Sequence, residues 1–199
     1  MRLFIALDID DVIRERIVRF MEGVSGFAPD ARWAKPESLH VTLKFIGEQP
    51  EAMLEEIKHG LGTIAAGEVT QQFRGYGFFP TAKAPRVFWV GIEAGPELAT
   101  LAAMVDRQTG RLGIPREERG FSPHLTLARG GARGAHSSGS PHRRKEDGPN
   151  RSFQLLQEKL AVLPTPEFGT MTAREFYLYQ SELGRCGSRY TKLSRFALK

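Results

Sequence analysis

The chain has 199 residues, of which 41% are hydrophobic and 26% are charged, and it contains one cysteine. This composition excludes a collagen-like, wholly disordered or disulfide-stapled protein, and no apolar run is long enough for a transmembrane helix. The net charge of +5 favours anionic partners such as nucleic acid.

Apolar runs and helically spaced apolar residues predict a mixed succession of elements. In chain order these are a strand over 3–9, a helix over 13–24, a strand over 39–45, a helix over 53–64, and strands over 69–79 and 87–92. A helix then opens at Gly95-Pro96 and extends to 112, followed by a strand over 125–128, a helix over 153–163, and strands over 168–179 and 189–198. Because strands and helices do not alternate strictly, we predict an α+β fold with antiparallel sheets. The first apolar run is too short for a signal peptide and Cys186 cannot pair within the chain, so we expect a cytoplasmic protein.

Residues 130–150 differ from the rest of the chain, because they include five glycines, three serines and two prolines and almost no apolar side chains. Such a segment cannot bury enough surface to offset its ordering entropy, so we predict a mobile basic loop. Its residues Arg143, Arg144 and Lys145 could contact RNA phosphates, and a solvated insertion is the alternative.

Two histidines lie in matching contexts, Leu39-His40-Val41-Thr42-Leu43 and Pro123-His124-Leu125-Thr126-Leu127. Side chains alternate between the two faces of a strand, so each histidine shares a face with its threonine while the apolar neighbours face the core. Both His/Thr faces must then meet something polar.

Two histidines and two hydroxyls fit phosphodiester hydrolysis. Histidine titrates near neutral pH, so one ring can act as a base on water while the other protonates the leaving oxygen. Each threonine hydroxyl can donate a hydrogen bond to phosphate. A metal site is the alternative, but the chain has no HExxH motif and neither histidine motif holds a carboxylate, so we expect neither metal nor cofactor.

The same residues resemble the two-histidine (2H) phosphoesterase superfamily and, more closely, the RNA 2′,3′-cyclic phosphodiesterases, historically called 2′-5′ RNA ligases. The similar blocks are Trp33–Glu48, Phe78–Pro80, Pro85–Gly91, Phe121–Arg129 and Ser188–Leu193. The resemblance implies one bilobal domain over 1–199, with two pseudo-symmetric lobes. In each lobe an antiparallel sheet lines a central cleft and helices pack outside.

The resemblance also implies the reaction, which is metal-independent hydrolysis of an RNA 2′,3′-cyclic phosphate to a 2′-phosphate and a free 3′-hydroxyl. Two alternatives stay open: a 2′-5′ RNA ligase or small-nucleotide 2′-5′ phosphodiesterase, and a nucleotide-binding module without turnover. The substrate would be RNA or a nucleotide, with no membrane partner, and we expect a monomer.

Carried onto this chain, the resemblance makes His40 the proton donor and His124 the proton acceptor, with Thr42 and Thr126 holding the phosphate. Arg129 matches an arginine that helps with phosphate in the family. Strict alternation puts Arg129 on the face opposite His124, so this role requires the strand to end or bulge near Ala128.

Five aromatic side chains near these motifs could stack on a nucleobase, namely Trp33, Phe45, Phe78, Phe79 and Phe121. Core packing is the alternative for each of them. Alternation predicts in particular that Phe45 shares the apolar, core-facing side of its strand.

Overall fold

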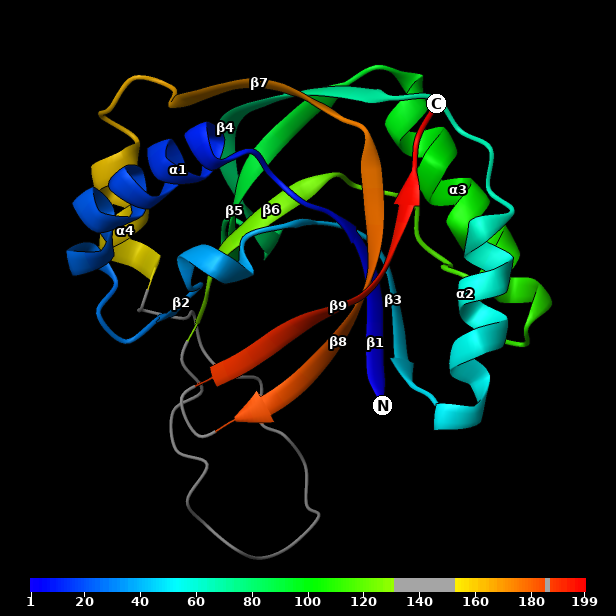
Figure 1. The fold of residues 1–199 in the computed structure, drawn as a ribbon. Helices are drawn as coiled ribbons and strands as arrows, with labels where there is room; N and C mark the ends of the chain where they lie inside the picture. Colours follow the sequence, from blue (N-terminus) through cyan, green and yellow to red (C-terminus); the bar gives the residue numbers. More distant parts are fainter. Residues whose placement is uncertain (131–152, 185–186) are drawn as a thin grey trace, which may run out of the picture.

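The strands of the computed structural model form two antiparallel sheets, and the structure describes residues 1–130, 153–184 and 187–199 (Figure 1). The first sheet has the order β3-β1-β8-β9, with β1 (Arg2–Leu7), β3 (Val41–Glu48), β8 (Glu175–Gly184) and β9 (Gly187–Ala197). The second has the order β2-β6-β5-β4-β7, with β2 (Arg32–Trp33), β6 (His124–Arg129), β5 (Ala84–Ala94), β4 (Val69–Thr81) and β7 (Glu167–Ala173). The predicted α+β class with antiparallel sheets is confirmed.

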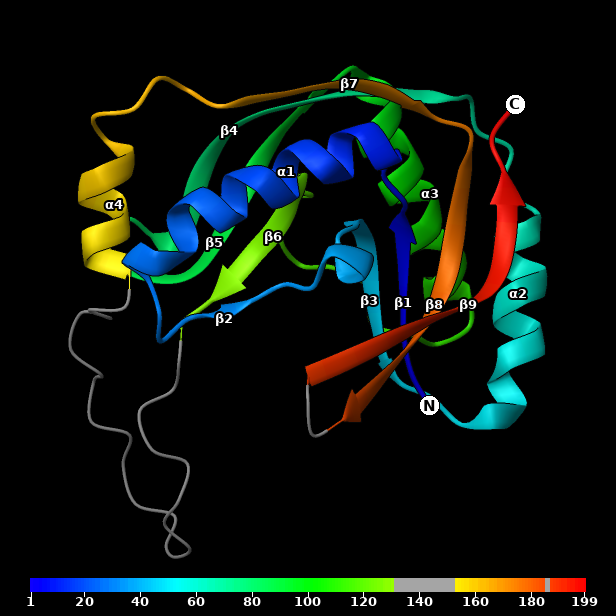
Figure 2. The same cartoon turned by 60° about the vertical axis from the view of Figure 1, so that its left-hand side comes forward.

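The helices lie outside the sheets, in two groups (Figure 2). Helices α1 (Asp11–Val24) and α4 (Gln154–Leu160) lie beside the second sheet, and α1 packs on β7. Helices α2 (Leu54–Gly62) and α3 (Pro96–Arg111) lie beside the first sheet, and α3 packs on β3. Across the described residues, every helix is too short or too polar to span a membrane.

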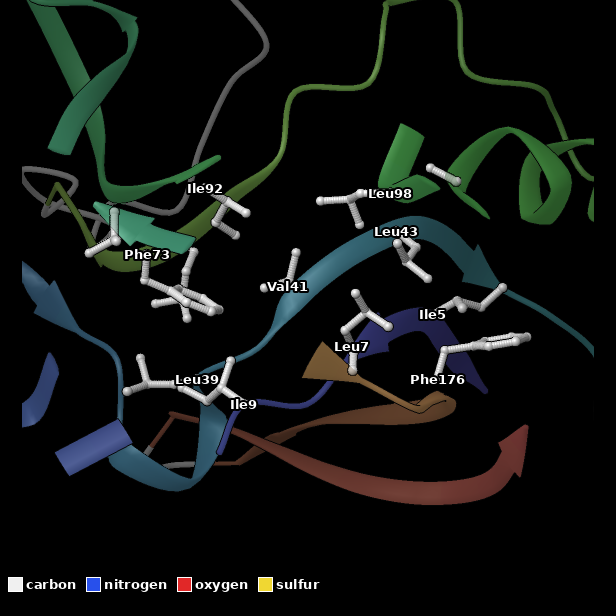
Figure 3. Packing of buried hydrophobic residues seen from close by; sticks show 14 of the residues in the cluster. Ile5, Leu7, Ile9, Leu39, Val41, Leu43, Phe73, Ile92, Leu98 and Phe176 are labelled. Carbon is white, nitrogen blue, oxygen red and sulfur yellow. The ribbon is translucent and has the colours of Figure 1, made fainter. Parts of the chain in front are cut away.

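One apolar core joins the two sheets. Figure 3 shows Leu39, Val41 and Leu43 of the β3 segment beside Leu7 of β1 and Ile92 of β5, within a single buried cluster. Burying each side chain of this size contributes about 1.5–3 kcal/mol, so this face of β3 is firmly directed inward. The polar residues that alternate with these side chains must point the other way.

Two predicted boundaries need correction, and one strand was not predicted. The single strand predicted over 168–179 is two strands, β7 and β8, which belong to different sheets and are separated by Arg174. The helix predicted over 153–163 ends at Leu160, and Leu163 is 51% exposed. The two-residue strand β2 was missed because so short a run carries no periodicity. The loop predicted over 130–150 lies outside the described residues, apart from Gly130.

Candidate active site

The two histidines stand at the start of equivalent strands. His40 directly precedes β3 and His124 is the first residue of β6, and these two strands approach each other although they belong to different sheets. The apolar residues next to the histidines are buried, whereas both histidines and both threonines remain partly exposed. Burial of the apolar faces therefore directs the His/Thr faces away from the core.

Both imidazoles are held by the same backbone contact. Nδ1 of His40 lies 2.6 Å from the carbonyl oxygen of Ser38, and Nδ1 of His124 lies 2.8 Å from the carbonyl oxygen of Ser122. A carbonyl accepts but cannot donate, so Nδ1 carries the proton in each ring. Nε2 is then the atom left to gain or lose a proton in a reaction.

Aromatic side chains fix the His40 ring from two sides. The ring centroid of Phe4 lies 4.8 Å from that of His40, and Tyr190 meets His40 edge-on at 5.3 Å. Tyr179 stacks on Phe4 at 5.0 Å and extends this aromatic surface along the first sheet. His40 therefore has little freedom to turn away from its carbonyl partner.

A second aromatic pair supports His124. Phe79 meets the His124 ring edge-on at 4.9 Å, and Trp89 lies against Phe79 at 4.9 Å. The indole occupies the space where a side chain of residue 77 would start, since a Cβ there would lie 2.2 Å from the indole ring. Glycine at position 77 is thus required for Trp89 to reach this position.

A β-bulge in β6 decides where Arg129 points. Thr126 pairs with Trp89 and Ala128 pairs with Phe88, so Leu127 is an extra residue in β6. Leu127 and Ala128 are both buried, and Arg129 returns to the exposed face that carries His124 and Thr126. The bulge that the predicted phosphate role of Arg129 required is present.

A second β-bulge occurs at the equivalent place in β3. Thr42 pairs with Ala6 and Lys44 pairs with Ile5, which leaves Leu43 as the extra residue. Leu43 and Lys44 are both buried, and Phe45 is 57% exposed. The prediction that Phe45 faces the core is therefore wrong, because the bulge reverses the alternation that the prediction assumed. We call His40, Thr42, Phe45, His124, Thr126 and Arg129 together the histidine site.

The other aromatic candidates differ in their surroundings. Trp33 packs edge-on against Phe88 at 5.9 Å and donates its Nε1 hydrogen to the carbonyl of Ala28 at 3.1 Å, so it serves packing. Phe78 stacks on Phe88 at 5.0 Å and also contributes to the core. Phe121 packs against the same core.

Charged groups on β6 affect the pKa values of both histidines. Burial lowers the pKa of His40 to about 4, although the Ser38 carbonyl and the charge of Asp8 act in the opposite direction. The charges of Arg129 and His124, both on β6, lower the pKa of His40 further. Burial and the Arg129 charge also lower the pKa of His124. Arg129 therefore acts electrostatically on both rings.

A buried ion pair anchors the segment that leads to His124. The bulge turns Lys44 toward the core, where its side chain is 1% exposed and its Nζ lies 2.6 Å from Oδ1 of Asp106 in α3. Lys44 also donates to the carbonyl of Pro115 at 2.9 Å, and Asp106 accepts from Arg116 Nε and from Glu117 N. These bonds connect β3, α3 and residues 115–117, which precede β6.

The described residues contain no group of three or more His, Cys, Asp or Glu side chains placed to hold a metal ion. His59 is exposed on α2 and is not part of either histidine motif. His136 and His142 lie outside the described residues.

Comparison with known proteins connects this geometry to a family. The sequence profile described as LigT like Phosphoesterase matches twice, over residues 7–89 and 90–190, so each match contains one histidine motif. An RNA 2′,3′-cyclic phosphodiesterase of Archaeoglobus fulgidus is 33% identical over 98% of this chain and 99% of its own length. One of Methanothermobacter thermautotrophicus is 30% identical over 99% and 98%.

Solved structures agree with this assignment. Escherichia coli LigT complexed with 3′-AMP has a TM-score of 0.75 at 29% identity, over 99% of this chain and 97% of that chain. The match therefore extends over both sheets and both histidine strands. The chain belongs to the LigT-like phosphoesterase family of two-histidine phosphoesterases.

Proposed function

We propose that this protein hydrolyses the terminal 2′,3′-cyclic phosphate of RNA to a 2′-phosphate and a free 3′-hydroxyl, without a metal ion. The observation that carries the proposal is the paired placement of His40 and His124, each with Nδ1 bonded to a backbone carbonyl and Nε2 available. The relatives from Archaeoglobus fulgidus and Methanothermobacter thermautotrophicus are named RNA 2′,3′-cyclic phosphodiesterase. We expect one bilobal unit that acts as a cytoplasmic monomer.

In the proposed reaction the two histidines exchange protons with opposite sides of the phosphorus atom. Nε2 of His124 takes a proton from the attacking water, while Nε2 of His40 gives a proton to the 3′ oxygen as the P–O3′ bond breaks. The hydroxyls of Thr42 and Thr126 donate to non-bridging oxygens, and Arg129 stabilises their negative charge. The assignment of donor and acceptor follows the family resemblance.

Nucleotide binding by related structures supports a nucleotide substrate. Escherichia coli LigT was solved with 3′-AMP and, in another structure, with phosphate. In the present chain, the cation of Arg129 and the exposed ring of Phe45 come from the equivalent positions of β6 and β3. We propose that Arg129 contacts the phosphate and that Phe45 stacks on the terminal base.

The proposed function is tested with an RNA oligonucleotide that ends in a 2′,3′-cyclic phosphate. We expect a product with a 2′-phosphate and a free 3′-hydroxyl, identified by phosphorus NMR, at a rate that dialysis against EDTA leaves unchanged. A 3′-phosphate product would reverse the assignment of donor and acceptor. A rate that EDTA abolishes and a divalent metal restores would contradict the metal-independent mechanism, and absence of hydrolysis would contradict the function.

Replacement of Phe45 by alanine is expected to raise KM while changing kcat less. Stacking of one base on an aromatic ring contributes about 1–3 kcal/mol, which corresponds to a rise in KM of about 5- to 150-fold. Val12→Ala is the matched control, because Val12 is 58% exposed on α1 and Phe45 is 57% exposed. Ribose 2′,3′-cyclic phosphate, which lacks a base, should be hydrolysed with the same KM by the Phe45 variant and the wild type. An unchanged KM for RNA would exclude stacking by Phe45.

A further inference from the structure

The two histidine strands are nearly equivalent, but the strands beside them differ at one position. In the second sheet Gly91 of β5 pairs directly with His124. In the first sheet Leu7 of β1 pairs with Val41, and continuing this register by one residue brings Asp8 beside His40. The carboxylate of Asp8 thus has only a hydrogen atom as its counterpart in the second sheet.

Gly91 cannot be exchanged for a residue with a side chain. A Cβ at position 91 would lie 2.6 Å from the carbonyl oxygen of Arg74, which is a backbone atom and cannot move aside as a flexible side chain would. The difference between the two sheets is therefore built into the backbone of β4 and β5.

Asp8 is held in a defined place and orientation. Its Oδ1 accepts from Arg14 Nη2 at 2.8 Å and from Ile9 N at 2.9 Å, and its Oδ2 accepts from Lys192 Nζ at 2.5 Å. Its side chain is 31% exposed, so solvent screens the negative charge only in part. A carboxylate held near an imidazole favours the protonated ring.

Arg14 extends this arrangement to the backbone around His40. Its Nη1 donates to the carbonyl of Pro36 at 2.7 Å, and Pro36 begins the turn that contains Ser38. The Ser38 carbonyl is the acceptor for Nδ1 of His40. Asp8 therefore acts on His40 both through its charge and, by way of Arg14, through the position of the ring.

Other charged and titratable groups also surround His40, and their effects must be distinguished from that of Asp8. They are Arg14 on α1, Tyr179 on β8, Tyr190 and Lys192 on β9, and His124 and Arg129 on β6. These groups are cations, phenols or an imidazole, whereas Asp8 is a carboxylate. The charge of Arg129 favours the neutral form of both His40 and His124, so it does not by itself distinguish the two rings.

We propose that Asp8 is the positioning residue that makes His40, rather than His124, the proton donor. This inference rests on the proposed hydrolysis and gives a reason, within this chain, for a direction that the two similar motifs leave open. Burial and the charge of Arg129 lower the pKa of His40, and the carboxylate of Asp8 opposes this effect. A bound phosphodiester anion acts in the same direction as Asp8, so that His40 holds a proton when the substrate is bound. His40 then loses it to O3′ as the P–O3′ bond breaks, and His124 gains one from the water that forms the new P–O bond.

The test compares the pH dependence of kcat in Asp8→Asn and Lys192→Met. Asp8→Asn should move the alkaline limb, where His40 loses its proton, to lower pH by about one unit and lower the rate above that limb about 10-fold. Lys192→Met removes a cation and should move the same limb to higher pH. Asp30→Asn is the matched control, because Asp30 is an exposed carboxylate in the turn between α1 and β2, and it should leave the profile unchanged. If Asp8→Asn and Lys192→Met each lower kcat without moving the alkaline limb of the pH profile, Asp8 has only a structural role.

A second measurement does not depend on activity. The histidine rings are titrated by NMR in protein saturated with inorganic phosphate, in the wild type and in Asp8→Asn. The midpoint of His40 should fall by about one unit in the variant and that of His124 should change less, since a unit charge at short range has an effect of this order. An equal or larger change at His124 would overturn the proposal. This result stands even if the cyclic phosphodiester assay shows no turnover, so the two proposals can fail separately.

Discussion

Replacement of either site histidine by alanine lowers kcat by about 10²–10⁴-fold, the contribution that general acid or base catalysis typically makes. The reason is that each Nε2 is the one atom of its ring left to exchange a proton, since Nδ1 is bonded to a backbone carbonyl. The measurement is single-turnover hydrolysis of an RNA 2′,3′-cyclic phosphate. A rate near that of the wild type in His40→Ala or His124→Ala would remove that histidine from the mechanism.

One control variant and two further site variants separate chemistry from folding in this experiment. His59→Ala changes an exposed histidine on α2 and should leave both kcat and the melting temperature unchanged. Thr42→Val and Thr126→Val remove one hydroxyl each and should slow the reaction by about 10- to 100-fold, as expected for a hydrogen bond to a charged group. The site variants should retain the wild-type circular dichroism spectrum, because the two rings lie outside the main apolar core.

Replacement of Lys44 by methionine is expected to lower the free energy of unfolding by about 3 kcal/mol. The substitution keeps the length and apolar character of the side chain but leaves the carboxylate of Asp106 without its buried partner, and breaking such a pair costs about 3–5 kcal/mol. Because Asp106 still accepts from Arg116 and from the backbone of Glu117, we expect the lower end of this range. Urea unfolding followed by circular dichroism gives the difference.

Lys58→Met is the matched control for this ion pair. Lys58 and Glu55 form an ion pair of similar length, 2.7 Å, at the surface of α2, where the Glu55 side chain is 80% exposed. Such a pair contributes about 0–1 kcal/mol. If the two lysine variants lose the same stability, the buried pair is no more important than an exposed one.

The pH dependence of stability gives an independent check on the same pair. Burial raises the pKa of Asp106, but hydrogen bonds from Lys44, Arg116 and Glu117 outweigh it and lower the pKa to about 2. A carboxyl whose pKa is lower in the folded than in the unfolded protein stabilises the fold above its unfolded value of 3.8. This stabilisation is lost as the pH falls toward 2, so the difference between Lys44→Met and wild type should become smaller over that interval.

Much of the fold was predictable because its elements carry strong periodic patterns. The apolar stripe Ile13, Ile17, Met21 and Val24 marks α1, and the mixed order of elements indicated antiparallel sheets. The facing of His40 and His124 was predictable as well, since the buried neighbours Val41 and Leu125 determine which side of the strand remains exposed.

The side chains beyond the threonines were harder to place because both strands bulge without a local sequence signal. Neither Leu43 nor Leu127 is a glycine or proline, and nothing in the pattern distinguishes an extra residue from a regular one. Phe45 was misplaced for this reason, and the direction of Arg129 was left conditional. Asp8 was overlooked, although it follows Phe4 and Ala6 at even spacing and therefore lies on their face of β1, opposite Leu3, Ile5 and Leu7. Since Phe4 contacts His40, this spacing could have indicated a position on the His40 face.

The paired bulges also determine which genetic changes the two strands can accept. Exchange of the side chain at Phe45 or Arg129 alters what the site touches without moving the histidines, because the bulge lies between the two parts of the strand. Regular alternation at the same chain length would turn the fifth residue after the histidine toward the core. Deletion of Leu43 or Leu127 would instead remove the bulge and keep Phe45 or Arg129 on the outer face, but it would take one buried leucine from the core. Deletions here should therefore cost stability, whereas substitutions at Phe45 and Arg129 should be accepted more readily. The two strands thus keep the same bulged backbone, while one presents an aromatic ring at Phe45 and the other presents a positive charge at Arg129.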